Sequence, residues 1–110
     1  MVSPVKVVFI TTPGGEVAEN LARALVTEQI VACVNRIRNV QSCYMWEGEL
    51  CDEPEELLII KTIEDNLDRL KARVTELHPY DMPELLVLPV EDGFPGYLQW
   101  VQDTCRQTRE

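Results

Sequence analysis

The apolar positions in the first third of the chain follow a strand-like pattern and then a helical one. Residues 5–12, VKVVFITT, form a short β-branched run that is typical of a strand. Within residues 13–29, Val17, Leu21 and Leu25 recur every four positions, which predicts a helix with one apolar stripe. The chain is therefore expected to begin with a strand followed by a helix.

A long β-hairpin is expected in the middle of the chain. Residues 31–46 predict one strand with a bulge near Asn39, and residues 47–48 (Glu-Gly) predict the turn. The return strand is expected over residues 50–63, with Pro54 at an edge or bulge position. Such strands exceed the usual length of about 5–6 residues. The tip of the hairpin is therefore expected to extend beyond its own sheet and to pair with a neighbouring subunit.

The second half repeats the first. Residues 64–77 predict an amphipathic helix, residues 83–90 a fourth strand and residues 96–108 a short last helix. The order β-α-β-β-α-β with a C-terminal helix predicts an α+β, ferredoxin-like fold in a single domain over residues 1–110.

Both faces of the predicted sheet carry apolar side chains. In three of the predicted strands, apolar residues occupy both sets of alternating positions. One set is Val5, Val7 and Phe9, Leu57 and Ile59, and Leu85 and Val87, and the set on the opposite face of the same strands is Val8 and Ile10, Leu58 and Ile60, and Leu86 and Leu88. Two helices cover only one face of such a sheet, so either the C-terminal helix or another subunit must cover the second. An open apolar face of this size would exceed what soluble monomers expose. The pattern predicts an obligate oligomer.

The composition narrows the possible partners. The net charge is −9, and the ten Lys and Arg residues are dispersed along the chain, which disfavours binding to nucleic acid or to an anionic membrane. The N-terminal apolar run is short and is broken by Lys6, so neither a membrane span nor a signal peptide is expected. These features predict a cytoplasmic protein.

The four cysteines show no metal-binding spacing. Cys43 and Cys51 flank the predicted turn, so a cross-strand disulfide is conceivable, although a reducing compartment argues against it. The redox state of this pair stays open at this level. Six acids cluster around the same hairpin and are expected to form a solvated tip: Glu47, Glu49, Asp52, Glu53, Glu55 and Glu56.

His78 is the only histidine, and it allows three interpretations. A transition-metal site generally needs three or four ligands, so His78 would need Asp81, Glu84 or copies from neighbouring subunits. It could instead line a ligand-binding site. The third possibility is a structural one, in which the imidazole bonds a carbonyl where the helix ends.

Other polar and aromatic positions are candidates for a site. Lys61 lies in the apolar stretch LLIIKTI and needs a carboxylate or an anion, for which Glu84 is a plausible partner. Tyr80 is either a core residue or a donor facing a cleft. Trp46 and Tyr44, near the hairpin turn, are typical of a subunit contact, with ligand stacking as the alternative. Nucleophilic catalysis is not expected, because the chain has two serines, one histidine, no GxSxG, no P-loop and no GxGxxG.

Five stretches together carry a family resemblance: VACVNRI, SCYMWEGEL, LLIIKT, HPYDMPELLVLPV and YLQWV, in this order between residues 5 and 103. They resemble the CutA family of divalent-cation tolerance proteins. The resemblance implies a homotrimer of ferredoxin-like subunits with PII-like architecture, hairpins paired between subunits, and clefts between protomers. It implies a role in the response to metal ions and no enzymatic activity.

The resemblance also bears on ligands. Copper-binding members have a cysteine near the end of the first strand and a second histidine before HPY, where this chain has Ile10, Thr11 and Leu77. Only His78 corresponds to that set, so a weak contact with Cu²⁺ or Zn²⁺ is implied. The implied cleft residues are Lys61, His78, Tyr80, Glu84 and Trp46. The alternatives are a PII-like sensor that binds a small anion through Lys61 and a structural trimer that binds a protein partner.

Overall fold

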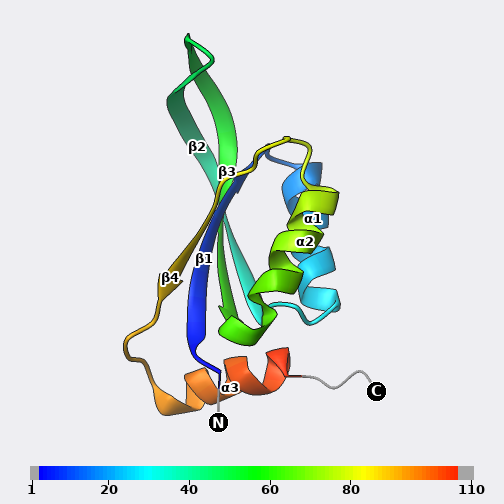
Figure 1. Ribbon diagram of the computed structural model, residues 1–110, viewed down its shortest axis with the longest axis vertical. Coiled ribbons are helices and arrows are strands. Elements are labelled where there is room, and N and C mark those ends of the chain that lie inside the picture. Colours follow the sequence, from blue (N-terminus) through cyan, green and yellow to red (C-terminus); the bar gives the residue numbers. More distant parts are fainter. Residues whose placement is uncertain (1–2, 107–110) are drawn as a thin grey trace.

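The fold consists of one antiparallel sheet with two helices on one face and a third helix at its end. The computed structural model describes residues 3–106. The elements are β1 (Val5–Thr12), α1 (Glu16–Thr27), β2 (Cys33–Trp46), β3 (Glu49–Ile63), the 3₁₀ turn η1 (Glu64–Asn66), α2 (Leu67–Leu77), β4 (Leu85–Pro89) and α3 (Pro95–Cys105). The strand order is β2-β3-β1-β4, and α1 and α2 lie side by side on the same face (Figure 1). The predicted ferredoxin-like fold is confirmed.

The core lies between the sheet and the two long helices. Alternate positions of β1 and β3 point toward α1 and α2, whose four-residue apolar stripes meet them. The fully buried members include Val8, Ile10, Leu58 and Ile60 from the strands and Leu21, Leu25, Leu70 and Val74 from the helices. Their burial fixes which face of each strand is the inner one.

The hairpin of β2 and β3 runs well beyond the helices along the longest axis of the molecule (Figure 1). Trp46 pairs with Glu49 across a two-residue turn in which Glu47 and Gly48 both have positive φ, 51° and 81°. This turn is the type that suits the twist of a hairpin. The ladder is irregular between Ile37 and Val40, and Asn39 has a φ of 64° there, so the predicted bulge is confirmed.

The register of the hairpin rules out the conceivable disulfide. Cys43 pairs with Asp52, and Cys51 pairs with Tyr44, so the two thiols lie on opposite faces of the hairpin. Both are free cysteines. Because the turn is at residues 47–48, Cys51 is one position out of register with Cys43.

The C-terminal helix covers only the end of the second face. Val101 and Cys105 of α3 pack against Val5 and Ile63, at the start of β1 and the end of β3 (Figure 1). No helix covers the rest of that face, and we call this part of the sheet the uncovered face. Its apolar residues are Val7, Phe9, Ile37, Leu57, Ile59, Leu86 and Leu88. Leu86 is 57% exposed. Of the predicted helix 96–108, residues 107 and 108 lie outside the described residues.

In residues 3–106, no helix is long and apolar enough to cross a membrane.

Candidate functional site

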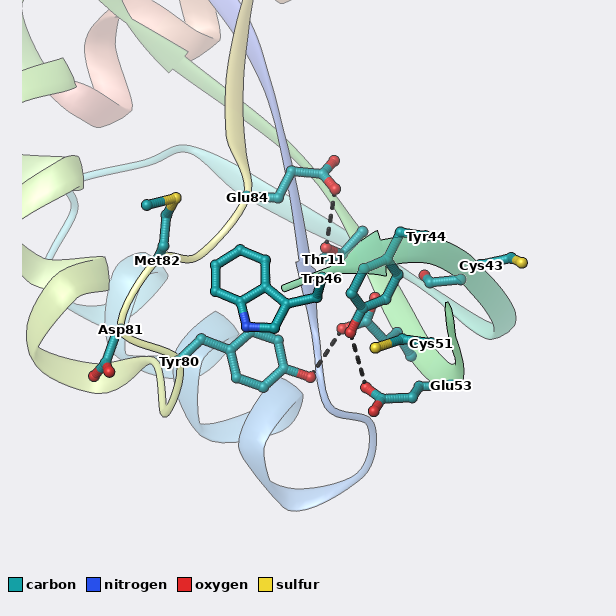
Figure 2. A pocket seen from close by; sticks show the side chains of 12 residues that line it. Thr11, Cys43, Tyr44, Trp46, Cys51, Glu53, Tyr80, Asp81, Met82 and Glu84 are labelled. Carbon is teal, nitrogen blue, oxygen red and sulfur yellow. Dashed lines mark hydrogen bonds between the residues drawn. The ribbon is translucent and has the colours of Figure 1, made fainter. Parts of the chain in front are cut away.

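A cleft of about 750 Å³ opens between the base of the hairpin tip and the segment that connects α2 to β4 (Figure 2). One wall comes from the two hairpin strands, and the other comes from the connecting segment. The lining residues are Thr11, Ser42, Cys43, Tyr44, Trp46, Cys51, Glu53, Glu55, Tyr80, Asp81, Met82 and Glu84.

Strand alternation builds the hairpin wall. Tyr44 and Trp46 are two residues apart on β2, and Cys51, Glu53 and Glu55 are two apart on β3, so their side chains share one face. Continuing this alternation along β3 leads to Leu57 and Ile59, so the cleft adjoins the uncovered face. In Figure 2 the Cys43 side chain points away from the cleft.

His78 fixes the opposite wall. Its backbone N–H ends α2 by donating to the Val74 carbonyl at 2.8 Å, and only 6% of the residue is exposed. The ring Nδ1 accepts the Tyr80 backbone N–H at 3.2 Å, which leaves the proton on Nε2 to be donated to the Thr11 carbonyl at 2.9 Å. The His78 and Tyr80 rings are also in contact, with centroids 4.8 Å apart. His78 therefore holds Tyr80 beside the end of β1.

Two tyrosine–glutamate hydrogen bonds lie in the cleft, and the one between Tyr80 and Glu55 joins its two walls. The Tyr80 hydroxyl donates to Glu55 Oε2 at 3.0 Å, and the Tyr44 hydroxyl donates to Glu53 Oε1 at 3.1 Å (Figure 2). Desolvation, followed by the hydrogen bond to the glutamate, raises the pKa of each tyrosine to about 12. Both phenols are therefore neutral donors at neutral pH.

Five residues were expected at a cleft between protomers, and the cleft within this one chain brings together only some of them. Trp46, Tyr80 and Glu84 line it, whereas His78 lies behind Tyr80 and Lys61 lies further along β3. The expected pairing of Lys61 with Glu84 is wrong. Lys61 stands opposite Val7 and bonds Asn35, with Cys33 Sγ 3.7 Å from its Nζ.

The register explains that error. Glu84 accepts a hydrogen bond from Thr11 at 3.2 Å, and Thr11 is four residues from Val7 on β1. At the rise of a strand, about 3.4 Å per residue, this separation is about 14 Å. The side chain of Lys61, opposite Val7, is too short to span this distance along β1 and reach the Glu84 carboxylate beside Thr11.

No ready-made metal site is present in the described part of the chain, residues 3–106. No three of its histidine, cysteine, aspartate and glutamate side chains form a group that could hold an ion. Both nitrogens of His78 are already hydrogen-bonded, so metal ligation by this ring would require at least one of these bonds to break.

The acids of the hairpin are not uniformly solvated, which corrects the expectation from the sequence. Glu55 and Glu56 are 6% and 5% exposed, one on each face of β3. The alternation of side chains along β3 could have identified Glu55, because Glu55 lies on the same face of the strand as Cys51 and Glu53, and that face continues into the uncovered face. Tyr44, which the sequence favoured as a subunit contact, lines the same cleft.

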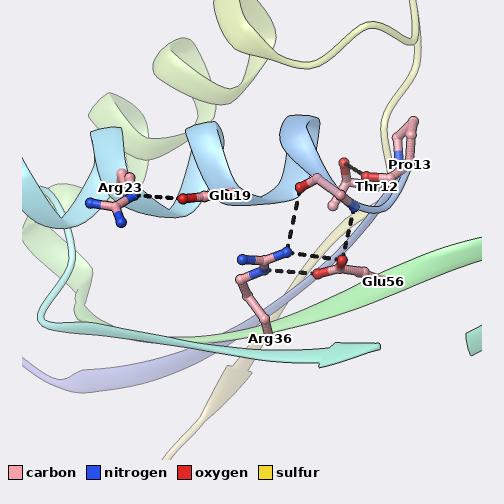
Figure 3. Close-up of polar contacts among 7 residues, drawn as sticks. Thr12, Pro13, Glu19, Arg23, Arg36 and Glu56 are labelled. Carbon is pink, nitrogen blue, oxygen red and sulfur yellow. Dashed lines mark hydrogen bonds and ion pairs between the residues drawn. The ribbon is translucent and has the colours of Figure 1, made fainter. Parts of the chain in front are cut away.

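Glu56 anchors the loop between β1 and α1 (Figure 3). Its carboxylate accepts from Arg36 Nε at 2.8 Å, from Arg36 Nη2 at 3.0 Å and from the Gly15 N–H at 2.9 Å. Gly15 has a φ of 70°, which other residues adopt only with strain. The hydrogen bonds from Arg36, ahead of the one from Gly15, hold the pKa of Glu56 below its usual value.

The fold and the cleft define a small ferredoxin-like α+β protein with an uncovered apolar face and an acidic cleft beside a protruding hairpin. The family described as CutA1 divalent ion tolerance protein matches residues 6–104. The divalent-cation tolerance protein CutA of Thermus thermophilus is 44% identical over 98 residues, which cover 89% of this chain and 95% of that protein. This chain belongs to the CutA1 divalent ion tolerance protein family, as the resemblance in the sequence indicated.

Solved structures agree with this assignment. CutA1 from Oryza sativa superposes with a TM-score of 0.93 and 40% identity, over 97% of this chain and 98% of that one. CutA1 from Thermus thermophilus gives a TM-score of 0.89 and 43% identity, over 91% and 97% of the two chains.

The relatives differ in length and in compartment. The chloroplastic CutA 1 protein of Oryza sativa is 41% identical over 96% of this chain, which spans 59% of that protein. The CutA structure from Archaeoglobus fulgidus is described as periplasmic. A cytoplasmic location for this chain therefore stays a prediction.

Proposed function

We propose that this chain acts in tolerance to divalent cations as a homotrimer, with its single domain as the subunit. Membership of the family supports the role in cation tolerance. The single observation that carries self-association is the uncovered face, because α3 packs at the end of the sheet and leaves Leu86, Leu88 and Ile37 exposed.

The protruding hairpin supports the same conclusion. Beyond Thr12, which pairs with Glu56, β1 ends and the two hairpin strands continue without a third strand. An isolated two-stranded ribbon is marginally stable in water. A neighbouring subunit would cover both this ribbon and the uncovered face that adjoins it.

Static light scattering on the purified chain tests the assembly. We expect a monodisperse species of three times the 12.6 kDa chain mass. A monodisperse monomer would overturn the proposed assembly, and a dimer would overturn the trimer while leaving self-association in place.

We also propose that any contact with a divalent metal is weak and depends on carboxylates. The cleft carries Glu53, Glu55, Asp81 and Glu84, whose oxygens suit hard cations, whereas His78 is held in its corner by two hydrogen bonds. This lining disfavours the alternative of a small anion in the cleft, since Lys61 lies outside it.

Calorimetric titration with Cu²⁺ and with Zn²⁺ measures this contact. Weak binding is expected in the wild type. If His78→Ala leaves the heats unchanged, His78 is not a ligand, and if Glu84→Gln also leaves them unchanged, the cleft is not the site of metal contact.

Its compartment is proposed to be the cytoplasm. The four cysteines are free, which suits a reducing environment.

A further inference from the structure

The cleft has an unusual charge balance for a surface hollow. Four of its lining residues are carboxylates, and no lysine or arginine is among the residues that line it. Glu55 is largely buried, and its only hydrogen bond within the described residues is the one from Tyr80 to Oε2. The interior of the cleft therefore favours a positively charged occupant.

Three aromatic side chains surround the same space. Tyr44, Trp46 and Tyr80 line the cleft and are 37%, 50% and 37% exposed. Figure 2 shows their rings gathered between the hairpin and the connecting segment. Aromatic rings present a negative face to a cation, and tryptophan does so most strongly.

The hydrogen bonds determine what the tyrosines offer to a ligand. Each hydroxyl proton is already donated to a glutamate, at 3.1 Å for Tyr44 and 3.0 Å for Tyr80. The groups that remain for a ligand are the ring faces and the oxygen lone pairs, and both attract positive charge.

The chemistry of the lining distinguishes between kinds of cation. A calcium or magnesium ion needs about six or more oxygen ligands at short range, and three of the four carboxylates already accept hydrogen bonds from Tyr80, Tyr44 and Thr11. No metal-binding group is found within residues 3–106. A methylated ammonium has a diffuse charge and an apolar surface, so it can use ring faces and nearby carboxylates without direct ligation.

We propose that the cleft binds a small organic ammonium ion, a quaternary or methylated amine, with Trp46, Tyr44 and Tyr80 against its methyl groups and Glu53, Glu55 and Glu84 balancing its charge. This ligand class goes beyond divalent-cation tolerance. All the groups named belong to one chain. The inference rests on the proposed function in one respect: the neighbouring subunit expected beside the hairpin must leave this cleft open to a small ligand, so binding is measured on the assembled protein.

Fluorescence in a Trp100→Phe background tests the proposal directly. Trp100 lies on α3, outside the cleft, so this change leaves Trp46 as the only tryptophan. Choline and tetramethylammonium should change the Trp46 emission saturably. The neutral isostere 3,3-dimethylbutan-1-ol should bind at least about tenfold more weakly, because it lacks the charge that the rings and carboxylates recognise.

Matched variants, measured by calorimetry with choline, localise the site. Trp46→Leu and Glu55→Gln should each weaken binding about tenfold. Trp100→Leu, which removes a similarly exposed tryptophan on α3, should leave it unchanged. Light scattering checks that each variant keeps the wild-type mass. If Trp46→Leu alters that mass, Glu84→Gln serves as the second variant.

Three results would overturn the proposal: no saturable response to choline, equal binding of the neutral isostere, or equal losses in the Trp46→Leu and Trp100→Leu variants. Displacement of choline by Zn²⁺ at equimolar concentration would also overturn it, because the cleft would then bind the metal at least as tightly as the ammonium ion, whereas the proposed weak metal contact predicts displacement only by an excess of Zn²⁺. Failure here would leave the light-scattering result for the assembly unaffected.

Discussion

At the scale of single residues, burial separates side chains that look alike in the sequence. Glu55 and Glu56 are adjacent acids, yet Glu55 faces the cleft and accepts from Tyr80, and Glu56 faces α1 and bonds Arg36. The ion pair between Arg36 and Glu56 is largely shielded from water, so it stabilises the fold only while both charges are present and hydrogen-bonded to each other.

Replacing Glu56 tests this dependence. Glu56→Gln should lower the free energy of unfolding by about 2–3 kcal/mol at pH 7, since it removes the buried carboxylate charge that accepts hydrogen bonds from Arg36 and Gly15. The matched control is Glu19→Gln, which breaks an exposed i,i+4 contact with Arg23 at 3.0 Å and should cost less than about 0.5 kcal/mol. Urea titration measures both, and equal costs would contradict the assigned role of Glu56.

The same pair predicts a pH dependence. The pKa of Glu56 is lower in the folded protein than its ordinary value of 4.5. The stabilisation is therefore fully present above about pH 4.5 and is lost as the pH falls through the lowered folded pKa. The difference between wild type and Glu56→Gln should shrink over that range, and a constant difference would show that charge is not the cause.

At the scale of elements, local hydrogen bonds decide where helices end. The end of α1 is a Schellman motif: Ile30 N–H donates to the Leu25 carbonyl and Gln29 N–H to the Val26 carbonyl. Ile30 and Leu25 both belong to the buried core. Gln29 has a φ of 59°, where glycine is the usual residue. No glycine marks this position in the sequence, so the expected end of the helix was placed at residue 29, not at Thr27.

Gln29→Gly should therefore stabilise the protein. Glycine adopts the positive φ of this position without strain, and this gain exceeds the cost of glycine's larger conformational entropy in the unfolded chain. The net gain in the free energy of unfolding should be about 0.5–1 kcal/mol. The neighbouring change Thr27→Gly, inside the helix, should destabilise by about 1 kcal/mol or less. Thermal unfolding compares the two, and a lower midpoint for Gln29→Gly would contradict this account of the helix end.

At the scale of the whole molecule, the uncovered face and the protruding hairpin are two consequences of one topology. Two helices and a short terminal helix are too few to cover both faces of a sheet with a 14-residue and a 15-residue strand. The net charge of −9 favours solubility, but it does not cover the apolar surface. We therefore expect stability to depend on assembly.

Leu86→Glu places a charge on the uncovered face, on the edge strand β4, and should give monomers. In the wild type the melting midpoint should rise with protein concentration, as it does when association stabilises the folded state, and in Leu86→Glu it should not. Val26→Glu, at a 40% exposed position on α1, is the matched control and should keep the wild-type mass. A trimeric Leu86→Glu variant would show that this face is not the interface.

Much of the fold could be predicted because its signals are local. The four-residue stripe of Leu21 and Leu25, the alternation along β1 and the turn at residues 47–48 each depend on neighbouring positions only. The candidate site was predicted less well. Trp46, Tyr80 and Glu84 line the cleft, but Lys61 was assigned to the wrong partner and the two buried glutamates were taken as solvated.

The sequence by itself determined the element order and the family, because apolar periodicity and motif order are properties of the chain. Only the tertiary structure decided which face of each strand is the inner one and which polar groups meet. Pairing partners depend on strand register, which brings Glu84 to Thr11 and Lys61 to Val7. The position of Tyr80 over Glu55 depends on the His78 corner, where contacts join residues 67 positions apart. Such contacts carry no local signal, since packing of the whole sheet sets them.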